Sequence, residues 1–386
     1  MVNLMESEEF LQSQLITYIG NKRALLDFIG EGVQLVQNKL KKEKLSCLDI
    51  FAGSGIVSRY LKQYSSEIAA NDLEEYSVII NKCYLSEVSD DELAELKVLY
   101  KKLIEKIDCR MKELELQREK GTYVHPGFIS ELYAPSDLEN ITKSDRCFYT
   151  PYNANYIDVC RQLISTEIPE KYQHYFIAPL LSQASIHANT AGIFKGFYKN
   201  SKTGTGQFGG NGKNALSRIM GKIELPFPVF LNTGCKSRVY NENANELVKN
   251  PSVGTFDLAY FDPPYNQHPY GSNYFMLNLI AKYQRPDCEK ISRVSGIPKD
   301  WNRSAYNKKR QVYDAMLDLV QSVKARFVLI SFNSEGFISK EDMEELLSNC
   351  GKVQVLESQY NTFRGSRNLV NRDIYVKEYL FLVEKI

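Results

Sequence analysis

The sequence lacks the residues that most metal sites and disulfide frameworks need. It has four histidines and one tryptophan, and its eight scattered cysteines form no CxxC pair and no metal-ligand spacing with histidine. Scattered thiols of this kind are typical of a reducing compartment. We therefore expect no metal and a cytoplasmic location.

Membrane and targeting segments are also missing from the sequence. No apolar run approaches the length of a membrane span, and the first ten residues, MVNLMESEEF, are acidic where a signal peptide is basic and then apolar. We find no internal repeat and no low-complexity tract. These features predict a protein without a membrane association.

An excess of charge is absent too. The 48 Lys and Arg residues nearly balance the 47 Asp and Glu residues, so the net charge is +1 and any basic surface must be local. A chain of 386 residues is long enough for one large domain with an insertion, or for two domains.

The most informative segment ends a short apolar strand. Residues 258–261 are typical of a buried parallel strand, which stops at Asp262-Pro263-Pro264-Tyr265 because two prolines remove two backbone donors and fix φ twice. We call residues 262–265 the hook. Ligands of open α/β sheets bind at such strand ends, and the hook's carboxylate, carbonyls and ring suit a flat heterocycle with an exocyclic amine. An ordinary Pro-Pro turn capped by aspartate is the alternative.

Residues 46–58 (SCLDIFAGSGIVS) predict a strand, a glycine turn and a helix. Gly53 and Gly55 allow a tight turn and the close approach of a ligand. The full GxGxxG spacing is missing and Asp49 lies within the motif, which favours a cationic or zwitterionic ligand over a pyrophosphate. A second strand, at 67–70, ends in Asn71-Asp72, where an acid can accept hydrogen bonds from the ribose hydroxyls of an adenosine.

Residues 18–23 (YIGNKR) precede an amphipathic helix predicted over 25–40. A glycine followed by Asn, Lys and Arg at a helix entrance can hold a carboxylate through backbone N–H groups, the helix dipole and Lys22. A solvated basic helix start is the alternative.

The middle of the chain has a different character. A capping box at 89–92 predicts a long charged helix reaching about residue 120, and further helices are predicted over 153–166 and 172–187. We interpret His187 as structural, since no Ser or Cys nucleophile motif accompanies it. Residues 195–218 mix Lys, Arg, Asn, Gly and aromatics without a single acid, which is typical of a loop that closes on nucleic acid, with a solvated linker as the alternative.

The last third of the chain predicts the rest of a mixed sheet. Strands are predicted over 237–240, 326–333, 352–360 and 379–384, and a helix over 275–283. Late hairpin-like strands after alternating β/α units imply an antiparallel edge. Residues 299–310 and 361–367 are rich in basic and aromatic residues, as are residues 195–218.

The order of these motifs resembles one family. YIGNKR, LDIFAGSG, ND after the second strand, a long insertion and FDPPY follow the order of the alpha-class, Dam-like DNA adenine-N6 methyltransferases, over nearly the whole chain. FYTPYNA, ANTAGIFKGFYK and DPPYNQHPYGSNY resemble the branch that includes the FokI modification methylase. The resemblance implies an α/β fold: a seven-stranded, mostly parallel sheet flanked by helices, as in Rossmann-like methyltransferases. Residues 1–84 and 237–386 would form the methyltransferase domain, and residues 85–236 a mainly helical target-recognition region.

The resemblance also implies S-adenosylmethionine as the cofactor and assigns residues to it. The residues that would hold it are Tyr18, Lys22, Asp49, Phe51, Gly53, Gly55, Asp72 and Asn243. Tyr18 and Lys22 would line its methionine end and Asp72 its ribose, while Asn243 stands where relatives usually have an aspartate. The basic residues expected to contact double-stranded DNA are Lys195, Lys199, Lys202, Lys213, Arg218, Arg303, Lys308, Lys309, Arg364 and Arg367.

The implied reaction methylates the N6 amine of an adenine that has been flipped out of the duplex. Asp262 and the carbonyl of Pro263 would accept the amine's two N–H bonds, Pro264 would stiffen the hook, and Tyr265 would stack on the ring. No metal and no covalent enzyme intermediate are needed, so positioning and electrostatics carry the rate. The alternatives are cytosine-N4 methylation, in which the hook more often begins with Ser, RNA or protein amine methylation, and a non-catalytic DNA-binding relative. A separate restriction endonuclease is an implied partner.

Overall fold

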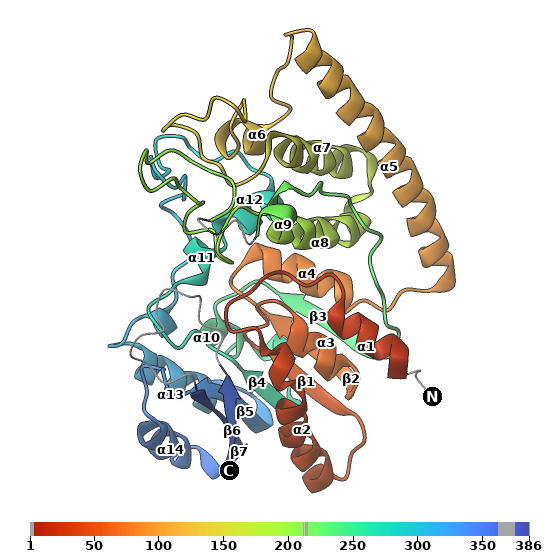
Figure 1. The fold of residues 1–386 in the computed structure, drawn as a ribbon. Coiled ribbons are helices and arrows are strands. Elements are labelled where there is room, and N and C mark those ends of the chain that lie inside the picture. Colours follow the sequence, from red (N-terminus) through yellow and green to blue (C-terminus); the bar gives the residue numbers. More distant parts are fainter. Residues whose placement is uncertain (1–3, 211, 213–214, 362–374, 386) are drawn as a thin grey trace. The chain divides into compact units, whose positions relative to one another are not determined.

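The structure, a computed structural model, describes residues 4–210, 212, 215–361 and 375–385 (Figure 1). The chain divides into two compact units. A helical unit comprises Met1–Gly20, Lys82–Asn232 and Tyr270–Trp301, and a sheet unit comprises Asn21–Asn81, Thr233–Pro269 and Asn302–Ile386. The divisions after residues 81 and 232 lie close to those expected at 84 and 236, whereas residues 1–20 and 270–301 belong to the helical unit.

The sheet unit contains one seven-stranded sheet in the order β3-β2-β1-β4-β5-β7-β6. Its strands are β1 (Leu45–Asp49), β2 (Ser65–Asn71), β3 (Lys236–Tyr240), β4 (Phe256–Phe261), β5 (Ala325–Asn333), β6 (Gly351–Asn361) and β7 (Tyr375–Lys385). The pairs from β3 through β5 are all parallel, and β7 is antiparallel to both of its neighbours. The predicted mostly parallel sheet with an antiparallel component is confirmed.

Helices cover both faces of this sheet (Figure 1). The helical segments of the unit are η1 (Lys22–Leu25), α2 (Leu26–Leu40), α3 (Ile56–Lys62), α4 (Glu75–Tyr84, which runs into the helical unit), α10 (Ala244–Leu247), η2 (Pro251–Val253), η3 (Ala305–Asn307), α13 (Val312–Ser322) and α14 (Lys340–Ser348). On β5, Val328, Ile330 and Phe332 pack in one core with α13 and α14. Leu329 points to the opposite face, where it lies against Gly32 of α2. Burial of both faces explains why β5 is an almost continuous apolar run.

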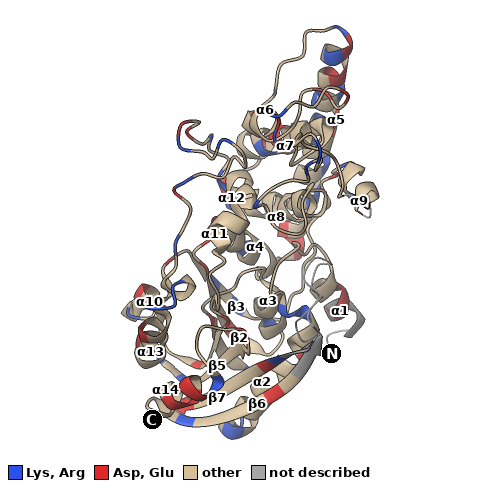
Figure 2. Cartoon of the chain, turned by 60° about the vertical axis from the view of Figure 1, so that its left-hand side comes forward, with Lys and Arg blue, Asp and Glu red and all other residues tan. Residues whose placement is uncertain are grey.

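The described part of the helical unit contains helices that range from 4 residues in α11 to 30 residues in α5. They are α1 (Leu4–Gln12), α5 (Asp90–Glu119), α6 (Phe128–Leu132), α7 (Pro151–Glu167), α8 (Glu170–Ile186), α9 (Leu216–Met220), α11 (Tyr270–Asn273) and α12 (Phe275–Lys282). The predicted capping box begins α5, since Ser89 Oγ accepts a hydrogen bond from Glu92 N at 3.2 Å. Leu96, Leu103 and Ile107 bury one stripe of α5, and the helix also contains acidic and basic residues (Figure 2). Among the described residues, no helix has both the length and the apolar character that a membrane crossing requires.

The α13 core supplies a stability test. Met316 of α13 is fully buried against the sheet, so we expect Met316→Ala to lower the free energy of unfolding by about 2–5 kcal/mol, since a cavity replaces the side chain. Urea unfolding followed by far-UV circular dichroism measures the change. Tyr313→Ala is the control on the same helix, since Tyr313 is 39 % exposed and its truncation leaves no cavity. Equal losses in the two variants would contradict the described packing.

Candidate active site

The carboxyl ends of β1, β2 and β4 meet at one edge of the sheet. β1 lies between β2 and β4, so the order of strands reverses there, and open α/β sheets bind ligands at such a switch point. Asp49, the last residue of β1, lies opposite Tyr260 of β4, and the hook begins two residues after Tyr260. This register brings Asp49 close to the hook.

The glycine turn after β1 has the backbone that the sequence predicts. Gly53 and Gly55 have φ values of +51° and +78°, and Gly55 N donates to Ala52 O at 2.8 Å before α3 begins. A Cβ at Gly55 would lie 3.2 Å from Asn81 Oδ1. Both the conformation and the available space therefore favour glycine at position 55.

Asp49 is a buried acid with one oxygen still available. Its Oδ2 accepts a hydrogen bond from Ser58 Oγ at 2.6 Å, while its Oδ1 accepts none from the described residues. Burial raises the pKa of Asp49 to about 7, with the Ser58 hydrogen bond acting in the opposite direction and the nearby Asp262 carboxylate raising it further. A buried acceptor without a donor is costly, so this oxygen suits a cationic or N–H-bearing ligand.

Asp72 follows β2 and braces the glycine turn. Its Oδ2 accepts from Gly53 N at 2.7 Å and its Oδ1 from Glu74 N at 2.9 Å. Burial raises the pKa of Asp72, and these backbone donors oppose the increase. Each carboxylate oxygen has two lone pairs, so Asp72 can also accept a ligand hydroxyl. Phe51 packs edge-on against Tyr306, with ring centres 5.0 Å apart.

Lys22 joins the hook to the start of β7. It is the first residue of η1, preceded by Asn21, whose Oδ1 accepts from Arg23 N. Lys22 Nζ lies 3.4 Å from Asp262 Oδ1 and 3.6 Å from Glu378 Oε2, and the Lys22 side chain is only 3 % exposed. We call Lys22, Asp262 and Glu378 the charged triad.

The three charges of the triad set one another's proton affinity. Burial alone would lower the pKa of Lys22, but the carboxylates of Asp262 and Glu378 outweigh this effect and raise it. Burial raises the pKa of Asp262 to about 6, Lys22 opposes this increase and Glu378 adds to it. Asp262 therefore stays mostly ionised at neutral pH, although its pKa lies well above that of a solvated aspartate.

Tyr265 closes the hook. Its ring packs edge-on against Phe332 with centres 6.0 Å apart, and Lys22 Nζ lies 5.7 Å from its ring centre. Its carbonyl accepts a hydrogen bond from Phe337 N at 3.0 Å. Pro263 is buried and Pro264 partly buried, so the hook is part of the packed sheet unit and not a solvated turn.

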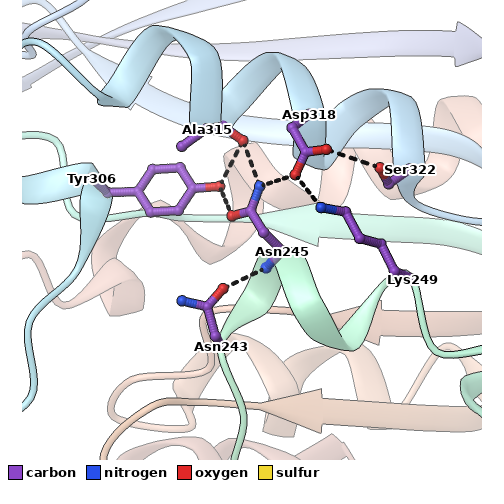
Figure 3. A network of polar contacts seen from close by, with 7 residues as sticks. All are labelled: Asn243, Asn245, Lys249, Tyr306, Ala315, Asp318 and Ser322. Atoms are coloured by element: carbon purple, nitrogen blue, oxygen red, sulfur yellow. Dashed lines mark hydrogen bonds and ion pairs between the residues drawn. The ribbon is translucent and has the colours of Figure 1, made fainter.

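Asn243 caps a short helix of the sheet unit. It is exposed and caps α10, where its Oδ1 accepts from Asn245 N at 3.0 Å (Figure 3). Asn245 in turn donates to Asp318 Oδ2 at 2.7 Å, and Tyr306 Oη donates to Asn245 Oδ1. The structure therefore explains Asn243 as a helix cap and leaves its assignment to a ligand as a prediction.

Tyr18 belongs to the helical unit, whereas the other residues predicted to bind the cofactor belong to the sheet unit. Its ring stacks on those of Tyr270 and Tyr274, with centres 5.1 Å and 4.8 Å away. The adjacent Ile19 N donates to Tyr274 Oη at 2.7 Å. These contacts tie Tyr18 and Ile19 to α11 and to the residue that precedes α12.

The predicted DNA-binding residues fall into several groups. Lys195, Lys199 and Lys202 are exposed in the helical unit, and the exposed residues Arg303, Lys308 and Lys309 lie near η3 in the sheet unit. Lys213, Arg364 and Arg367 lie outside the described residues. Lys, Arg, Asp and Glu residues occur in both units (Figure 2).

Arg218 is the exception among these basic residues. Its guanidinium donates to the carbonyls of Ile186, Ala188 and Thr190, so it holds the end of α8. His187 Nδ1 lies 2.7 Å from the Arg218 carbonyl oxygen, which fits the structural role predicted for this histidine. Among the described residues, no group of three or more acids, histidines or cysteines could hold a metal ion.

Sequence reasoning missed Glu378. The strand was predicted to begin at Tyr379, four residues after the start of β7 at Tyr375, because only the apolar run from Tyr379 onward has strand character. The available signal was an acid directly before a buried strand, but its partner, Lys22, is far away in the sequence. Only the fold brings the two together.

Known proteins resemble this chain over most of its length. Residues 18–346 match the family described as D12 class N6 adenine-specific DNA methyltransferase. The chain is 31 % identical over 374 residues to the type II methyltransferase M.CviAII of Paramecium bursaria Chlorella virus 1, covering 95 % of this chain and 98 % of that protein. It is 29 % identical over 378 residues to M.NlaIII of Neisseria lactamica, covering 96 % and 99 % of the two chains. It is 26 % identical to M.FokI of Planomicrobium okeanokoites, covering 95 % of this chain and 52 % of that one.

The charged triad predicts a stability effect that depends on pH. Lys22→Met leaves two buried carboxylates without a cation, so we expect the free energy of unfolding to fall by about 3–5 kcal/mol at pH 8. In the variant, the pKa of folded Asp262 lies above its unfolded value of about 4, so stability falls as pH rises through that window. The loss should therefore be smaller at pH 5, as measured by urea unfolding at both pH values.

The control for this variant is Lys42→Met. Lys42 pairs with Asp257 at 2.7 Å but is half exposed, and such surface pairs contribute about 0–1 kcal/mol. A pH-independent loss in Lys22→Met, or a loss no larger than that of Lys42→Met, would contradict the electrostatic account of the triad.

Proposed function

Because the chain belongs to the D12 class of N6 adenine-specific DNA methyltransferases, we propose that it transfers a methyl group from S-adenosylmethionine to the N6 amine of a flipped-out adenine in double-stranded DNA and that its hook holds this amine. The names of its relatives support a role in restriction–modification, and we propose that a cognate endonuclease acts separately.

One observation carries the assignment of the hook. Asp262, Pro263, Pro264 and Tyr265 directly follow β4, next to the strand whose glycine turn begins at Asp49. A partly buried acid at a switch point, beside carbonyls and an aromatic ring, supplies what an amine-bearing base requires. Asp262 also supports adenine over cytosine as the target, in agreement with the family.

The residues around the glycine turn fit S-adenosylmethionine. The available Oδ1 of Asp49 suits a ligand with a positive charge, the positive φ values of Gly53 and Gly55 allow its close approach, and Asp72 can accept from ribose hydroxyls. When bound, S-adenosylmethionine supplies a methyl group on a positively charged sulfur. We assign Lys22 to the hook, on the strength of its contact with Asp262.

The hook acts by orienting the amine. Asp262 and the carbonyl of Pro263 accept its two N–H bonds, which draws the nitrogen toward tetrahedral geometry and frees its lone pair. Tyr265 stacks on the extruded ring and replaces the stacking lost from the duplex. Asp262, ionised but with a pKa of about 6, is also suited to take the proton that the nitrogen loses.

We propose the helical unit as the region that reads the target sequence. The acid-free segment 195–218 lies in it and presents Lys195, Lys199 and Lys202 at its surface. Such cations contact phosphates, which position DNA without reading its sequence. Arg303, Lys308 and Lys309 would contact phosphates from the sheet unit.

The proposed function is tested by mapping modified bases. We expect DNA from a host without its own adenine methylation to acquire N6-methyladenine at one recurring sequence when the chain is expressed. Single-molecule sequencing and mass spectrometry of nucleosides measure this outcome. N4-methylcytosine without N6-methyladenine, or no modified base at all, would contradict the proposal.

Asp262→Ala tests the hook. The variant loses the acceptor for the amine, so we expect methyl transfer to DNA to fall by about 100–1000-fold, as is typical for the loss of one key polar group, while S-adenosylhomocysteine binding is retained. Transfer is measured with tritium-labelled S-adenosylmethionine and binding by calorimetry. Asp314→Ala, an exposed acid on α13, is the control. Full activity of Asp262→Ala would exclude the assignment.

Asp49→Ala tests the cofactor site separately. Removing the available acceptor should weaken S-adenosylhomocysteine binding by about 10–100-fold, as expected for a lost hydrogen bond to a charged group. Calorimetry without DNA measures the change. Unchanged binding would place the cofactor away from Asp49 and would leave the hook assignment intact.

A further inference from the structure

Glu378 is a buried acid that the proposed mechanism does not yet use. It lies near the start of β7, opposite Asn333 of β5, and is 5 % exposed. A buried carboxylate is retained only where it is paired, because its desolvation is costly. The cation beside it is Lys22, at 3.6 Å.

Lys22 is shared almost equally between two carboxylates. The distances of 3.4 Å to Asp262 and 3.6 Å to Glu378 are both longer than the roughly 2.7–2.9 Å of a close charged hydrogen bond. Lys22 Nζ therefore forms an ion pair with each acid at nearly the same distance. Glu378 thus competes with Asp262 for the same ammonium group.

This sharing affects the oxygen atoms that the reaction needs. A lysine closed on Asp262 would occupy an acceptor site and reduce the basicity of the carboxylate. A lysine held between two acids leaves the triad with one net negative charge. Asp262 is the more accessible acid, with its side chain 19 % exposed against 7 % for Glu378.

We propose that Glu378 is a positioning residue that holds Lys22 between the two carboxylates, so that Asp262 stays available to bind the adenine amine and to take its proton. In this step one N–H bond of the methylated amine breaks, its electron pair stays on nitrogen, and an O–H bond forms on Asp262, which then releases the proton to water. The inference rests on the proposed function and extends it to β7.

Other titratable groups also face the triad. The groups that couple to Asp262, Lys22 or Glu378 are Asp49 of β1, Tyr260 of β4 and Tyr265 of the hook. Burial raises the pKa of Tyr265 and, well above its ordinary value, that of Tyr260, so both remain neutral near pH 7. Asp49 titrates near pH 7, and its contribution must be separated from that of Asp262.

Glu378→Gln tests the proposal, with Glu384→Gln as the matched control. Glu384 lies on the same strand but is 38 % exposed and pairs with Lys39. Single-turnover methylation of host DNA that lacks adenine methylation is measured from pH 5 to 9. Without the second carboxylate the pKa of Asp262 falls, so we expect the acid limb of the Glu378→Gln profile to move to lower pH and its plateau rate to fall about 10-fold or more.

Three further measurements separate positioning from a general structural effect. The KM for S-adenosylmethionine should change less than twofold in Glu378→Gln. Carbon-13 NMR of labelled aspartate carboxyls, assigned with Asp262→Asn, should report a lower pKa for Asp262 without any turnover. In the Lys22→Met background, Glu378→Gln should cause no further slowing, because Glu378 acts through Lys22.

The outcomes are distinct. A wild-type plateau and acid limb in Glu378→Gln, or the same fold-loss with and without Lys22, would overturn the inference while leaving the proposed function intact. A wild-type chain that methylates no adenine would overturn both. Glu378→Asp, which withdraws the carboxylate by one methylene, should give an intermediate rate and acid limb. If Glu378→Gln does not fold, an unchanged Glu378→Asp profile overturns the proposal.

Discussion

The parallel pairing of β1 with β4 is the constraint on which the site depends. It places Asp49 beside Tyr260, two strand ends that are more than two hundred residues apart in the sequence. The entropy of closing so long a loop must be offset by burial, and the strands of this pair bury Cys47, Leu48, Leu258 and Ala259 almost completely. The apolar strands thus bring together polar groups that would otherwise repel one another.

Repulsion among these groups is central to their chemistry. Asp49, Asp72 and Asp262 all lose solvent where the strands end, and burial raises the pKa of each. A site with several acids and one lysine attracts a positively charged ligand and disfavours an anionic one. The same balance keeps Asp262 a better base than a solvated aspartate while Lys22 keeps it ionised near neutrality.

Local sequence patterns predicted most of the framework. The glycine turn, the capping box at Ser89 and the strand ended by two prolines each depend on neighbouring residues, and the structure contains all three. The patterns could not show which distant side chains meet. Lys22 was expected at a ligand's carboxylate, yet two of the protein's own carboxylates lie beside it. Arg218 was grouped with DNA contacts by composition, although its donors hold the end of α8. Asn243 marks a helix cap that only the fold reveals.

The antiparallel direction of β7 has a consequence for the timing of assembly. If β7 ran parallel to β5, residue 378, near the start of β7, would lie beside the amino end of β5. Because β7 is antiparallel, Glu378 lies opposite Asn333, at the carboxyl end of β5. Lys22 leaves the ribosome more than three hundred residues before Glu378 does. At roughly 5–20 residues per second, Lys22 therefore waits tens of seconds for its second carboxylate. The nascent chain can fold its glycine turn early, but its catalytic charges become balanced only after β7 has been translated.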